Sequence, residues 1–337
     1  MKFTKTFNQI NKNDADIAGG KGASLGEMTQ TGIPVPEGFV ILADAFNYFL
    51  EKSGLIAEVE SELNKINFED PNSVEETSER LRGLIEKIEV PMEIVEEIKK
   101  SYVELSKNCK PCLPAGRLTA NSFFVAVRSS ATAEDSSAAS WAGELESYLF
   151  TNQELLITNI KKCWSSLFTP RAIFYRHEKG MIKNHVAVAV VVQRMINSDV
   201  SGITFTVHPV TCDPNQMIIE AGWGLGEAIV GGMITPDDYI VAKQQVTSNK
   251  VTSDMRIQDI MVSEQEKMIV AKKDGGVEEV KVPSLKKDKQ KLSEDQILEI
   301  AEICQKIEDH YGFPCDIEWA FEKSKFYIVQ SRPITTL

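Results

Sequence analysis

The chain has 337 residues, of which 42% are hydrophobic and 26% are charged, the composition of a globular protein longer than one simple domain. Its 37 Lys and Arg residues against 49 Asp and Glu residues give a net charge of −12. This charge argues against a large nucleic-acid footprint, which needs a basic face, and restricts an anionic small ligand to a local cationic pocket.

The start of the chain has no apolar signal core, and no stretch approaches the length of a membrane span, so no membrane partner is expected. Six cysteines are scattered through the chain and are expected to be reduced thiols, which predicts a cytoplasmic protein. Cys109 and Cys112 form a lone C-x-x-C pair. A zinc site would need a second pair at suitable spacing, and the sequence offers none.

The first part of the chain mixes strands with amphipathic helices. Residues 1–50 predict a strand, a glycine turn, a helix and a second strand, and residues 55–107 have the apolar spacing of helices. A new strand is predicted from Phe123, and helices return over 153–180. The β-branched run from His185 to Gln193 predicts a buried strand.

A boundary between two lobes is expected near residue 196, which divides the chain into residues 1–195 and 196–337. The second lobe has predicted strands near 202–207, 217–221 and 238–242, an exposed hairpin or loop over 272–291, and a last helix that opens at Ser293 with a capping box to Gln296. Helices mixed with strands in two lobes predict an α+β fold.

A cluster of glycines surrounds Lys21 in the run I-A-G-G-K-G-A-S-L-G-E-M, at the expected start of a helix. A lysine is unfavourable beside the positive end of a helix. An anion bound there would remove the conflict, because backbone N–H groups and Lys21 would both face it. The run is not a P-loop, and a glycine turn with a solvated lysine is the alternative.

Arg128 ends the apolar strand V-A-V-R, and Ser130 and Thr132 follow it in a loop of small residues. A guanidinium group and hydroxyls are suited to gripping transferable phosphates, and small side chains let such a loop cover a ligand as a lid. The alternative is a Ser/Ala surface loop in which Arg128 forms a salt bridge to a nearby acidic residue.

Two further segments have weaker signals. The run G-W-G-L-G-E fails the dinucleotide fingerprint because Glu227 occupies the place of the third glycine, so Glu227 is expected to open a helix, with a role near ribose or metal as the alternative. The strand end V-V-Q-R-M-I has Gln193 as a polar break, and a planar base fits against Met195 and Ile196. A simple core strand is the alternative.

The last segment, Asp316 to Leu337, has two apolar–polar alternations around a turn, which predicts a β-hairpin. Its predicted core face carries Ile317, Trp319, Phe321, Tyr327 and Val329. The other face carries Glu318, Gln330 and Arg332. A carboxylate and an amide oxygen are able to hold Mg²⁺, and arginine is able to hold the phosphate that Mg²⁺ bridges. Pairing Glu318 with Gln330 predicts a three-residue loop, and a solvated face is the alternative.

Four motifs together resemble a known family. G-G-K-G-A-S-L-G-E-M, V-R-S-S-A-T-A-E-D, G-W-G-L-G-E and Q-S-R-P-I-T are similar, in this order, to the nucleotide-binding domain of the phosphoenolpyruvate synthase family, which includes pyruvate phosphate dikinase and rifampin phosphotransferase. The motifs span essentially the whole chain. The resemblance implies an ATP-grasp fold, in which ATP lies between two lobes.

The resemblance also implies roles at the matching positions. Lys21 and Arg128 resemble ligands of the ATP phosphates, and Ser130 and Thr132 resemble the mobile loop over them. The segment Gln193, Met195 and Ile196 resembles the adenine-binding segment, with Glu227 as a further cofactor-binding residue. Glu318 and Gln330 resemble Mg²⁺ ligands. Arg332 resembles the cation on the terminal phosphates, so Lys21, Arg128 and Arg332 are expected to act in catalysis by positioning and neutralising phosphates.

Two departures qualify the resemblance. The loop of the family usually continues S-F-A-G-Q, whereas Glu144 replaces the amide in this chain. Full-length members also have a swivelling domain with a phosphorylated histidine and a domain that binds pyruvate or rifampin. These partners are expected on a longer chain or a separate subunit, because none of the four histidines here lies in a loop rich in Gly, Ser or Thr.

The expected function is that of the Mg²⁺–ATP-binding part of a dikinase. Such an enzyme passes the β-phosphate of ATP to a histidine and leaves AMP and phosphate, with pyruvate as final acceptor and phosphoenolpyruvate as product. A rifampin phosphotransferase-like antibiotic kinase is one alternative, and an ATP-sensing module without turnover is another. The presence of Glu318, Gln330 and Arg332 together disfavours the sensor, which needs no complete metal and phosphate set.

Overall fold

The structure is a computed structural model that describes residues 2–108, 123–132, 146–182, 186–243, 246–247, 250–251, 255–273 and 275–335. Backbone contacts divide it into two compact units: unit 1 is Met1–Gln30 with Glu37–Met195, and unit 2 is Thr31–Pro36 with Ile196–Leu337. Both contain helices and antiparallel sheets, which confirms the α+β class. The ATP-grasp fold with lobes 1–195 and 196–337 stays a prediction. No helix in the described ranges is long and apolar enough to cross a membrane.

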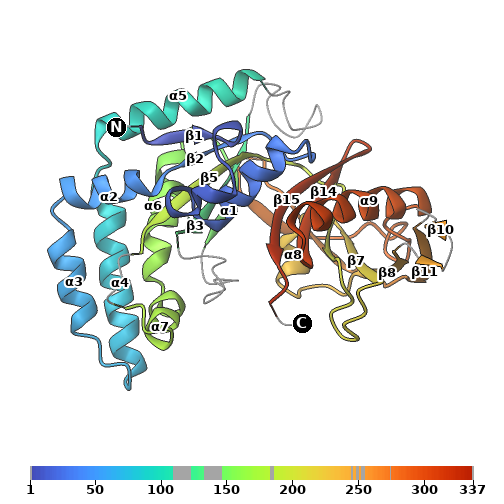
Figure 1. Ribbon diagram of the computed structural model, residues 1–337. Coiled ribbons are helices and arrows are strands. Elements are labelled where there is room, and N and C mark those ends of the chain that lie inside the picture. The colour runs from blue at the N-terminus through green and yellow to red at the C-terminus, as the bar shows by residue number, and fades with distance from the viewer. Residues whose placement is uncertain are drawn as a thin grey trace. The chain divides into compact units, whose positions relative to one another are not determined.

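Unit 1 is built on a five-stranded antiparallel sheet with the strand order β1-β2-β5-β3-β4 (Figure 1). The strands are β1 (Thr4–Thr6), β2 (Gly38–Ile41), β3 (Val125–Ala131), β4 (Ser147–Thr151) and β5 (Val188–Arg194). Residues 188–192 of the middle strand β5 are fully buried, as their β-branched sequence predicts. Successive side chains of each strand point to opposite faces, so the two faces of this sheet have different neighbours.

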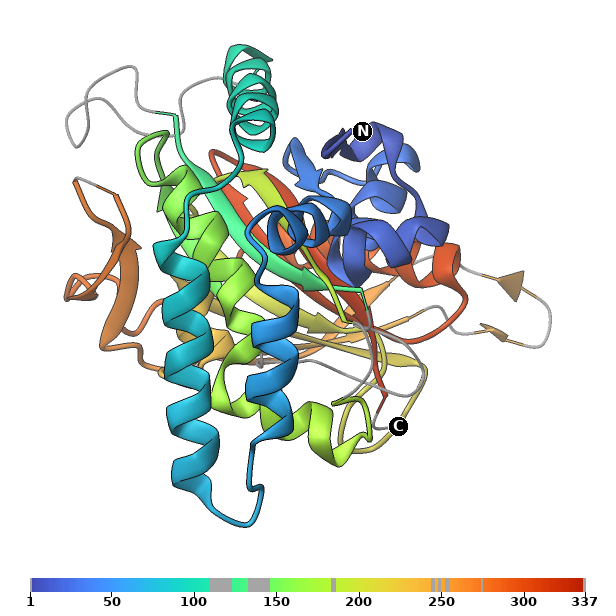
Figure 2. The same ribbon diagram turned by 90° about the vertical axis from the view of Figure 1, so that its left-hand side faces the viewer.

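A layer of helices covers one face of this sheet and encloses the main hydrophobic core. Its members are α2 (Ala43–Lys52), α3 (Ile56–Asn64), α4 (Pro71–Lys87), α5 (Met92–Asn108), α6 (Leu156–Ser165), the 3-10 turn η3 (Ser166–Phe168) and α7 (Pro170–Glu178). Figure 2 shows α4 and α6 packed side by side. Trp164 is fully buried in this core and stacks on Phe49 with ring centroids 5.2 Å apart. The predicted helices of this region are therefore confirmed.

The opposite face of the same sheet packs against α1 (Ala15–Gln30). Helical geometry breaks inside α1 at Gly19, which has φ 68° and ψ 169°. A Cβ on Gly22 would lie 3.1 Å from the Val40 side chain, so α1 lies directly on β2. The predicted order of strand, glycine turn, helix and strand is confirmed.

Unit 2 is built on a six-stranded antiparallel sheet with the strand order β11-β8-β7-β6-β14-β15. The strands are β6 (Val200–Phe205), β7 (Gln216–Trp223), β8 (Asp237–Ala242), β11 (Arg256–Met261), β14 (Cys315–Glu322) and β15 (Lys325–Pro333). Two small hairpins lie outside this sheet: β9 (Val246–Thr247) with β10 (Lys250–Val251), and β12 (Lys267–Ala271) with β13 (Val277–Lys281). The β12–β13 hairpin begins before the predicted segment 272–291.

One face of the unit 2 sheet is closed by α9 (Glu294–Tyr311), which runs beside β14 (Figure 1). Ser293 and Gln296 form the predicted capping box at its start. Trp319 is 1% exposed on this face, and its Nε1 donates to Thr204 Oγ1 at 3.0 Å. Below α9, the buried ion pair of Lys291 and Asp237, 2.6 Å apart, joins the segment before the helix to β8. The closed face therefore holds a buried core of unit 2.

Candidate functional site

The glycine turn of α1 is tied to β3 by one hydroxyl group. Ser130 Oγ donates to the carbonyl of Ala18 at 3.0 Å and accepts from the N–H of Gly22 at 3.2 Å. Lys21 lies between these two contacts, in the first turn of the helix that resumes after Gly19. The predicted place of Lys21 at a helix start is confirmed, and its role as a phosphate ligand stays a prediction.

Strand register places three more predicted residues, Arg128, Ser130 and Gln193, on the α1 face of the sheet. Arg128 pairs with Val191, and Ser130 pairs with Ala189 two residues further along β3. Gln193 pairs with both Ala126 and Gly38, so it points to the same face. Arg128, Ser130 and Gln193 are all buried, at 9%, 0% and 2% exposed. The structure thus gathers Lys21, Arg128 and Gln193 around one face, although they are far apart in sequence.

Three further predicted residues lie at the ends of these strands. Thr132 follows β3, and its Oγ1 donates to the carbonyl of Ala187 at 3.2 Å, so this hydroxyl is engaged with the chain itself. Met195 follows β5 and is 6% exposed, and its N–H donates to the carbonyl of Phe124 at 3.0 Å. Ile196, 3% exposed, is the first residue of this stretch that belongs to unit 2.

The hairpin of β14 and β15 pairs Glu318 with Gln330, as predicted, but its turn is shorter than predicted and its register shifts once. Glu322 pairs with Lys325, so the turn has two residues, Lys323 and Ser324, whose φ values of 51° and 61° are typical of a tight hairpin turn. The predicted three-residue loop is therefore wrong. The register shifts between Glu318 and Trp319, where Trp319 pairs with Ile328 and Val329 is the extra residue of a β-bulge.

The bulge also changes which side chains of β15 reach the core. Phe326 and Ile328 are 1% and 0% exposed and pair with Phe321 and Trp319 of the closed face. The prediction that Tyr327 and Val329 belong to the core face is wrong, because the shorter turn moves both by one position and leaves them half-buried. On β14 the predicted core residues Ile317, Trp319 and Phe321 are confirmed.

The face of the sheet opposite α9 collects the polar side chains of the hairpin. Asp316 pairs with Arg332 and Glu318 pairs with Gln330, so all four point to this face. Arg332 holds Asp316 through Nε and a terminal nitrogen, at 2.8 Å and 2.7 Å from Oδ2. Burial raises the pKa of Asp316 despite the neighbouring Arg332. The hairpin thus presents two carboxylates, an amide and a guanidinium together.

Neighbouring strands add two more carboxylates to this face. Glu318 pairs with Ile203 of β6, which pairs with Glu220 of β7, which in turn pairs with Asp238 of β8. Burial, followed by the charges of Asp238 and Asp316, raises the pKa of Glu220. The sequence could have placed Asp316 on this face, because it lies two residues before Glu318 on the same strand. Placing Glu220 and Asp238 there requires knowledge of the strand order in the sheet.

The glycine-rich turn after β7 lies at the edge of the same face. Glu227 begins the short helix α8 (Glu227–Val230), as predicted, and a Cβ on Gly222 of β7 would lie within 3.2 Å of Ile229 in this helix. Gly224 has φ 88°, and its carbonyl accepts from Ser198 Oγ at 2.9 Å and Ser201 Oγ at 2.8 Å. The glycines serve this tight packing, and the role of Glu227 toward a cofactor stays a prediction.

The donor set of the hairpin suits a divalent cation that prefers oxygen. Glu318 and Gln330 provide a carboxylate and an amide, the ligand types of Mg²⁺. Asp316 Oδ1 is buried and has no hydrogen-bond partner among the described residues. Within the part of the chain that the structure describes, no group of three or more His, Cys, Asp or Glu is arranged to hold a metal by itself. Waters or the oxygens of a bound phosphate would complete the coordination of a Mg²⁺ ion held by Glu318 and Gln330.

Some sequence features lie outside the described residues, namely Glu144 and the pair Cys109 and Cys112. Of the histidines described, His177 stacks on Phe68 with centroids 3.6 Å apart, and His208 Nδ1 accepts from two backbone N–H groups of its own loop. Both side chains therefore have partners within the chain itself.

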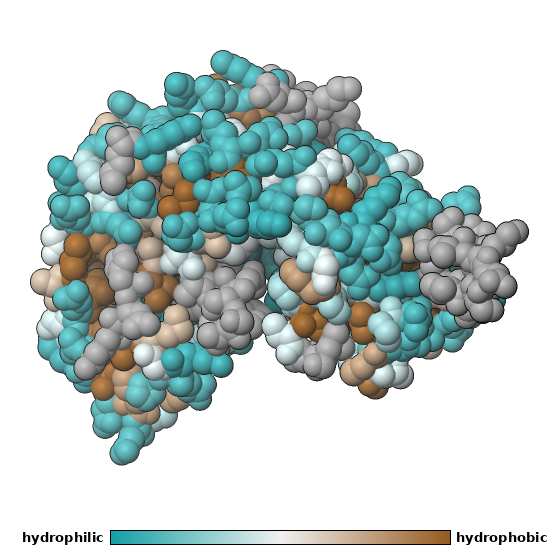
Figure 3. All heavy atoms as spheres, in the orientation of Figure 1, coloured by the Kyte–Doolittle hydropathy of each residue, from teal (hydrophilic) through white to brown (hydrophobic). Residues whose placement is uncertain are grey.

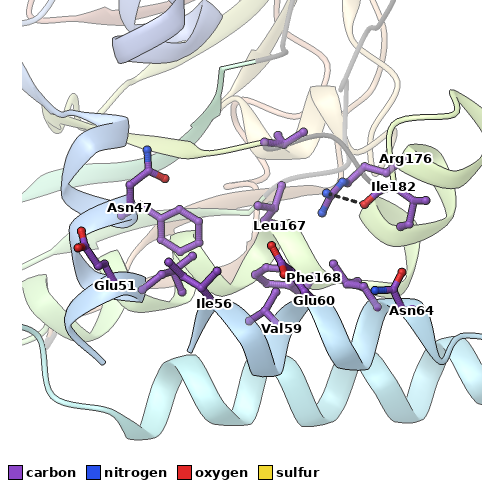
Figure 4. A pocket seen from close by; sticks show the side chains of 14 residues that line it. Asn47, Glu51, Ile56, Val59, Glu60, Asn64, Leu167, Phe168, Arg176 and Ile182 are labelled. Carbon is purple, nitrogen blue, oxygen red and sulfur yellow. Dashed lines mark hydrogen bonds between the residues drawn. The ribbon is translucent and has the colours of Figure 1, made fainter. Parts of the chain in front are cut away.

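Unit 1 also has a cavity of about 620 Å³, lined by residues of α2, α3, η3 and α7 (Figure 4). Apolar side chains also reach the surface of unit 1 over α3 and α4 (Figure 3), and Ile56 at the cavity is 45% exposed. Among the described residues that line the cavity, Arg176 is the one cation; it is 4% exposed and donates to the carbonyl of Ile182 at 3.3 Å. The cavity lies on the helical side of the sheet, opposite the glycine turn, and its apolar lining does not suit phosphates.

Comparison with known proteins identifies the family of the chain. Residues 15–337 match the family model described as "Pyruvate phosphate dikinase, AMP/ATP-binding domain". The chain is 43% identical to a probable phosphoenolpyruvate synthase of Methanocaldococcus jannaschii, 41% identical to the phosphoenolpyruvate synthase of Pyrococcus furiosus, and 35% identical to the rifampicin phosphotransferase of Bacillus cereus.

These matches cover 100%, 100% and 99% of this chain but only 27%, 44% and 36% of the three relatives. The chain therefore corresponds to part of each longer relative. The motif resemblance is confirmed, since the family match includes the glycine turn, β3 and the final hairpin. From these matches we conclude that the chain belongs to the pyruvate phosphate dikinase AMP/ATP-binding domain family, whose members include parts of phosphotransferases.

Proposed function

We propose that this chain binds Mg²⁺–ATP in an ATP-grasp fold with lobes 1–195 and 196–337, and that it acts as the nucleotide half of a dikinase. The observation that carries the proposal is the gathering of the motif residues on one sheet face in each unit, within a family of ATP-binding domains. In unit 2 this face is opposite the one that α9 closes, and in unit 1 it is the face that carries the glycine turn of α1.

In this proposal, Lys21 and Arg128 bind the phosphates of ATP, and Thr132 with Ser130 belongs to the segment beside them. Gln193, Met195 and Ile196 hold adenine, largely through backbone groups and apolar contact, and Glu227 lies near the ribose or metal. Arg332 neutralises the terminal phosphates while Asp316 fixes its guanidinium, a pairing supported by the 2.7 Å contact between them.

Glu318 and Gln330 would hold Mg²⁺ together with phosphate oxygens. When bound, Mg²⁺ supplies charge neutralisation to the phosphoryl groups. The neighbouring carboxylates of Asp316, Glu220 and Asp238 are consistent with this role, because burial and nearby carboxylates raise the pKa of each and a bound cation would favour their charged forms.

The final acceptor is proposed to be pyruvate, with the β-phosphate of ATP passing first to a histidine on a swivelling domain of a longer chain or of a separate subunit. The phosphoenolpyruvate synthases among the relatives favour this acceptor. Rifampin is the second proposed acceptor, because the rifampicin phosphotransferase is 35% identical to this chain.

Isothermal titration of the chain with ATP, in Mg²⁺ and then in excess EDTA, tests the proposal. We expect one-site binding in Mg²⁺ that weakens strongly in EDTA, and no consumption of ATP when pyruvate is added, because the acceptor histidine is expected elsewhere. Absence of ATP binding under both conditions would falsify the proposal. A stable phosphohistidine on this chain alone would instead contradict the proposal that the acceptor histidine lies on another domain or subunit.

A further inference from the structure

The hydroxyl of Ser130 acts as a helix cap supplied by a distant strand. The helix that resumes after Gly19 has Gly19 at its N-cap position, which makes Gly20, Lys21 and Gly22 its first three residues. An N-cap side chain normally accepts a hydrogen bond from the N–H of the second or third residue. Glycine has no side chain to do so, and Ser130 Oγ accepts from Gly22 in its place at 3.2 Å.

The same hydroxyl also provides a hydrogen-bond donor for a backbone carbonyl on the other side of the break. Ser130 Oγ donates to the carbonyl of Ala18, which immediately precedes Gly19, at 3.0 Å. One hydroxyl therefore bridges both ends of the interruption. Ser130 is 0% exposed, so the hydroxyl faces the turn and is closed off from solvent.

Strand β3 approaches this turn so closely that a side chain on Gly19 would collide with Ser130. A Cβ on Gly19 would lie 2.2 Å from Ser130 Oγ and 2.4 Å from the Ser130 carbonyl oxygen. Gly19 also has φ 68°, in the left-handed region that favours glycine. The turn and the strand thus fit each other through a glycine on one side and a small hydroxyl residue on the other.

The cap links the two cations that the proposed function assigns to ATP phosphates. Arg128 lies two residues before Ser130 on the same strand and the same face, and Lys21 is held between Ala18 and Gly22. Any displacement of the turn along β3 would change the separation between Lys21 and Arg128. Displacements of this size matter, because a misplacement of about 1 Å at a site can cost about 100-fold in rate.

We propose that Ser130 is a positioning residue that sets Lys21 relative to Arg128 by capping the interrupted helix, rather than a residue that contacts the nucleotide. This inference rests on the proposed function for the role of Lys21. It reassigns Ser130, whose expected place was among the hydroxyls that grip phosphate.

Ser129 offers a matched control on the same strand. It is 1% exposed and points to the other face, where its Oγ donates to the carbonyl of Glu146 at 2.5 Å and lies 3.1 Å from Ser166 Oγ. Ser129→Ala and Ser130→Ala therefore each remove one buried hydroxyl with two partners. Each is expected to lower the free energy of unfolding by about 1–3 kcal/mol, the range for a lost buried hydrogen bond.

The test measures the Kd for Mg²⁺–ATP of Ser129→Ala, Ser130→Ala, Lys21→Ala and the double variant Lys21→Ala/Ser130→Ala by titration calorimetry. We expect Ser130→Ala to weaken binding about 10-fold, Ser129→Ala to leave it within about 2-fold, and Ser130→Ala to have little further effect once Lys21 is absent. If Ser130→Ala does not fold, Ser130→Cys, which keeps a weak donor and acceptor, is expected to give the same pattern with a smaller change.

The outcomes separate the inference from the function on which it rests. The positioning role would be overturned if Ser129→Ala and Ser130→Ala changed the Kd equally. It would also be overturned if Ser130→Ala kept its full effect on the Kd in the Lys21→Ala background. In both cases the proposed binding of ATP would still stand. An unchanged Kd in Lys21→Ala would instead contradict the proposed role of Lys21, and with it the basis of the inference.

Discussion

The two proposed halves of the nucleotide site are positioned by different means. In unit 1, Lys21 lies at a break in a helix, and a buried hydroxyl from β3 holds this break. In unit 2, Glu318 and Gln330 lie on neighbouring strands, and the register of a hairpin with a bulge brings them together. The break in unit 1 is therefore held by two hydrogen bonds of one hydroxyl group, whereas the pair in unit 2 is held by a strand ladder with a packed core behind it.

This difference predicts where stability and binding can be separated by mutation. Residues on β14 alternate between the core below α9 and the polar face, so adjacent substitutions affect different properties. The glycine turn offers no such alternation, because the same contacts hold both the backbone and Lys21. Substitutions on the polar face of unit 2 should thus change binding without changing stability. Substitutions in the glycine turn of unit 1 should lower both binding and stability.

The largest expected effect is on stability, at Trp319. Trp319→Ala removes a fully buried ring that packs edge-on against Phe326 and donates to Thr204, and it should lower the free energy of unfolding by about 3–5 kcal/mol. Urea unfolding followed by far-UV circular dichroism measures this loss. A change below about 1 kcal/mol would contradict the assignment of this face as the core of unit 2.

Gly19→Ala should destabilise unit 1 by about 2–4 kcal/mol, because alanine is strained at φ 68° and its Cβ would collide with Ser130. Gly83→Ala is the matched control: Gly83 lies inside α4, and a Cβ there would meet nothing within 4 Å. Alanine at position 83 should raise stability by about 0.5–1 kcal/mol. Thermal melts of both variants check the opposite signs, and equal signs would refute the account of the turn.

Glu318→Ala should leave the fold intact and remove most of the Mg²⁺ dependence of ATP binding, with a loss in affinity of about 10–100-fold. The control is Glu279→Gln on the exposed strand β13, where Glu279 contacts Lys267 at 2.9 Å far from the hairpin in sequence. Titration with ATP at several Mg²⁺ concentrations measures the effect. An unaltered Mg²⁺ dependence in Glu318→Ala would remove the metal role of this face.

The smallest expected effect is a difference in reactivity between buried and exposed cysteine thiols. Burial raises the pKa of Cys163, Cys304 and Cys315 to about 12, whereas Cys212 is exposed. Among these four, only Cys212 should react with a maleimide or iodoacetamide at pH 8, because the thiolate is the reactive form. Peptide mass spectrometry locates the label, and rapid labelling of Cys163 in the folded chain would contradict its buried place.

The sequence predicts features that depend on local pattern. The start of α9 at Ser293, the break near Lys21 and the pairing of Glu318 with Gln330 all follow from neighbouring residues. The bulge at Val329 was missed because a two-residue turn plus one extra residue gives the same pairing as a three-residue loop. The alternation of the strand differs between these two solutions, and in the structure Ile328 rather than Val329 pairs with Trp319.

The contacts that complete the candidate site were beyond sequence reasoning. Ser130 and Ala18 are 112 residues apart, and no local pattern indicates that a hydroxyl on a strand caps a helix elsewhere. Glu220 and Asp238 join Glu318 through the strand order of the unit 2 sheet, which pairs β14 with the distant strand β6 as well as with β15. Long-range pairing of this kind is set by the packing of the whole unit.

The central proposal is that Lys21 and Arg332 both act on the phosphates of bound Mg²⁺–ATP. A double-mutant cycle of Lys21→Ala and Arg332→Ala, measured as the Kd for Mg²⁺–ATP, tests it most directly. The account predicts that each variant weakens binding and that the two effects differ from additivity by more than about 0.5 kcal/mol, as expected for groups that share a partner. Strictly additive effects, or an unchanged Kd in either single variant, would contradict it.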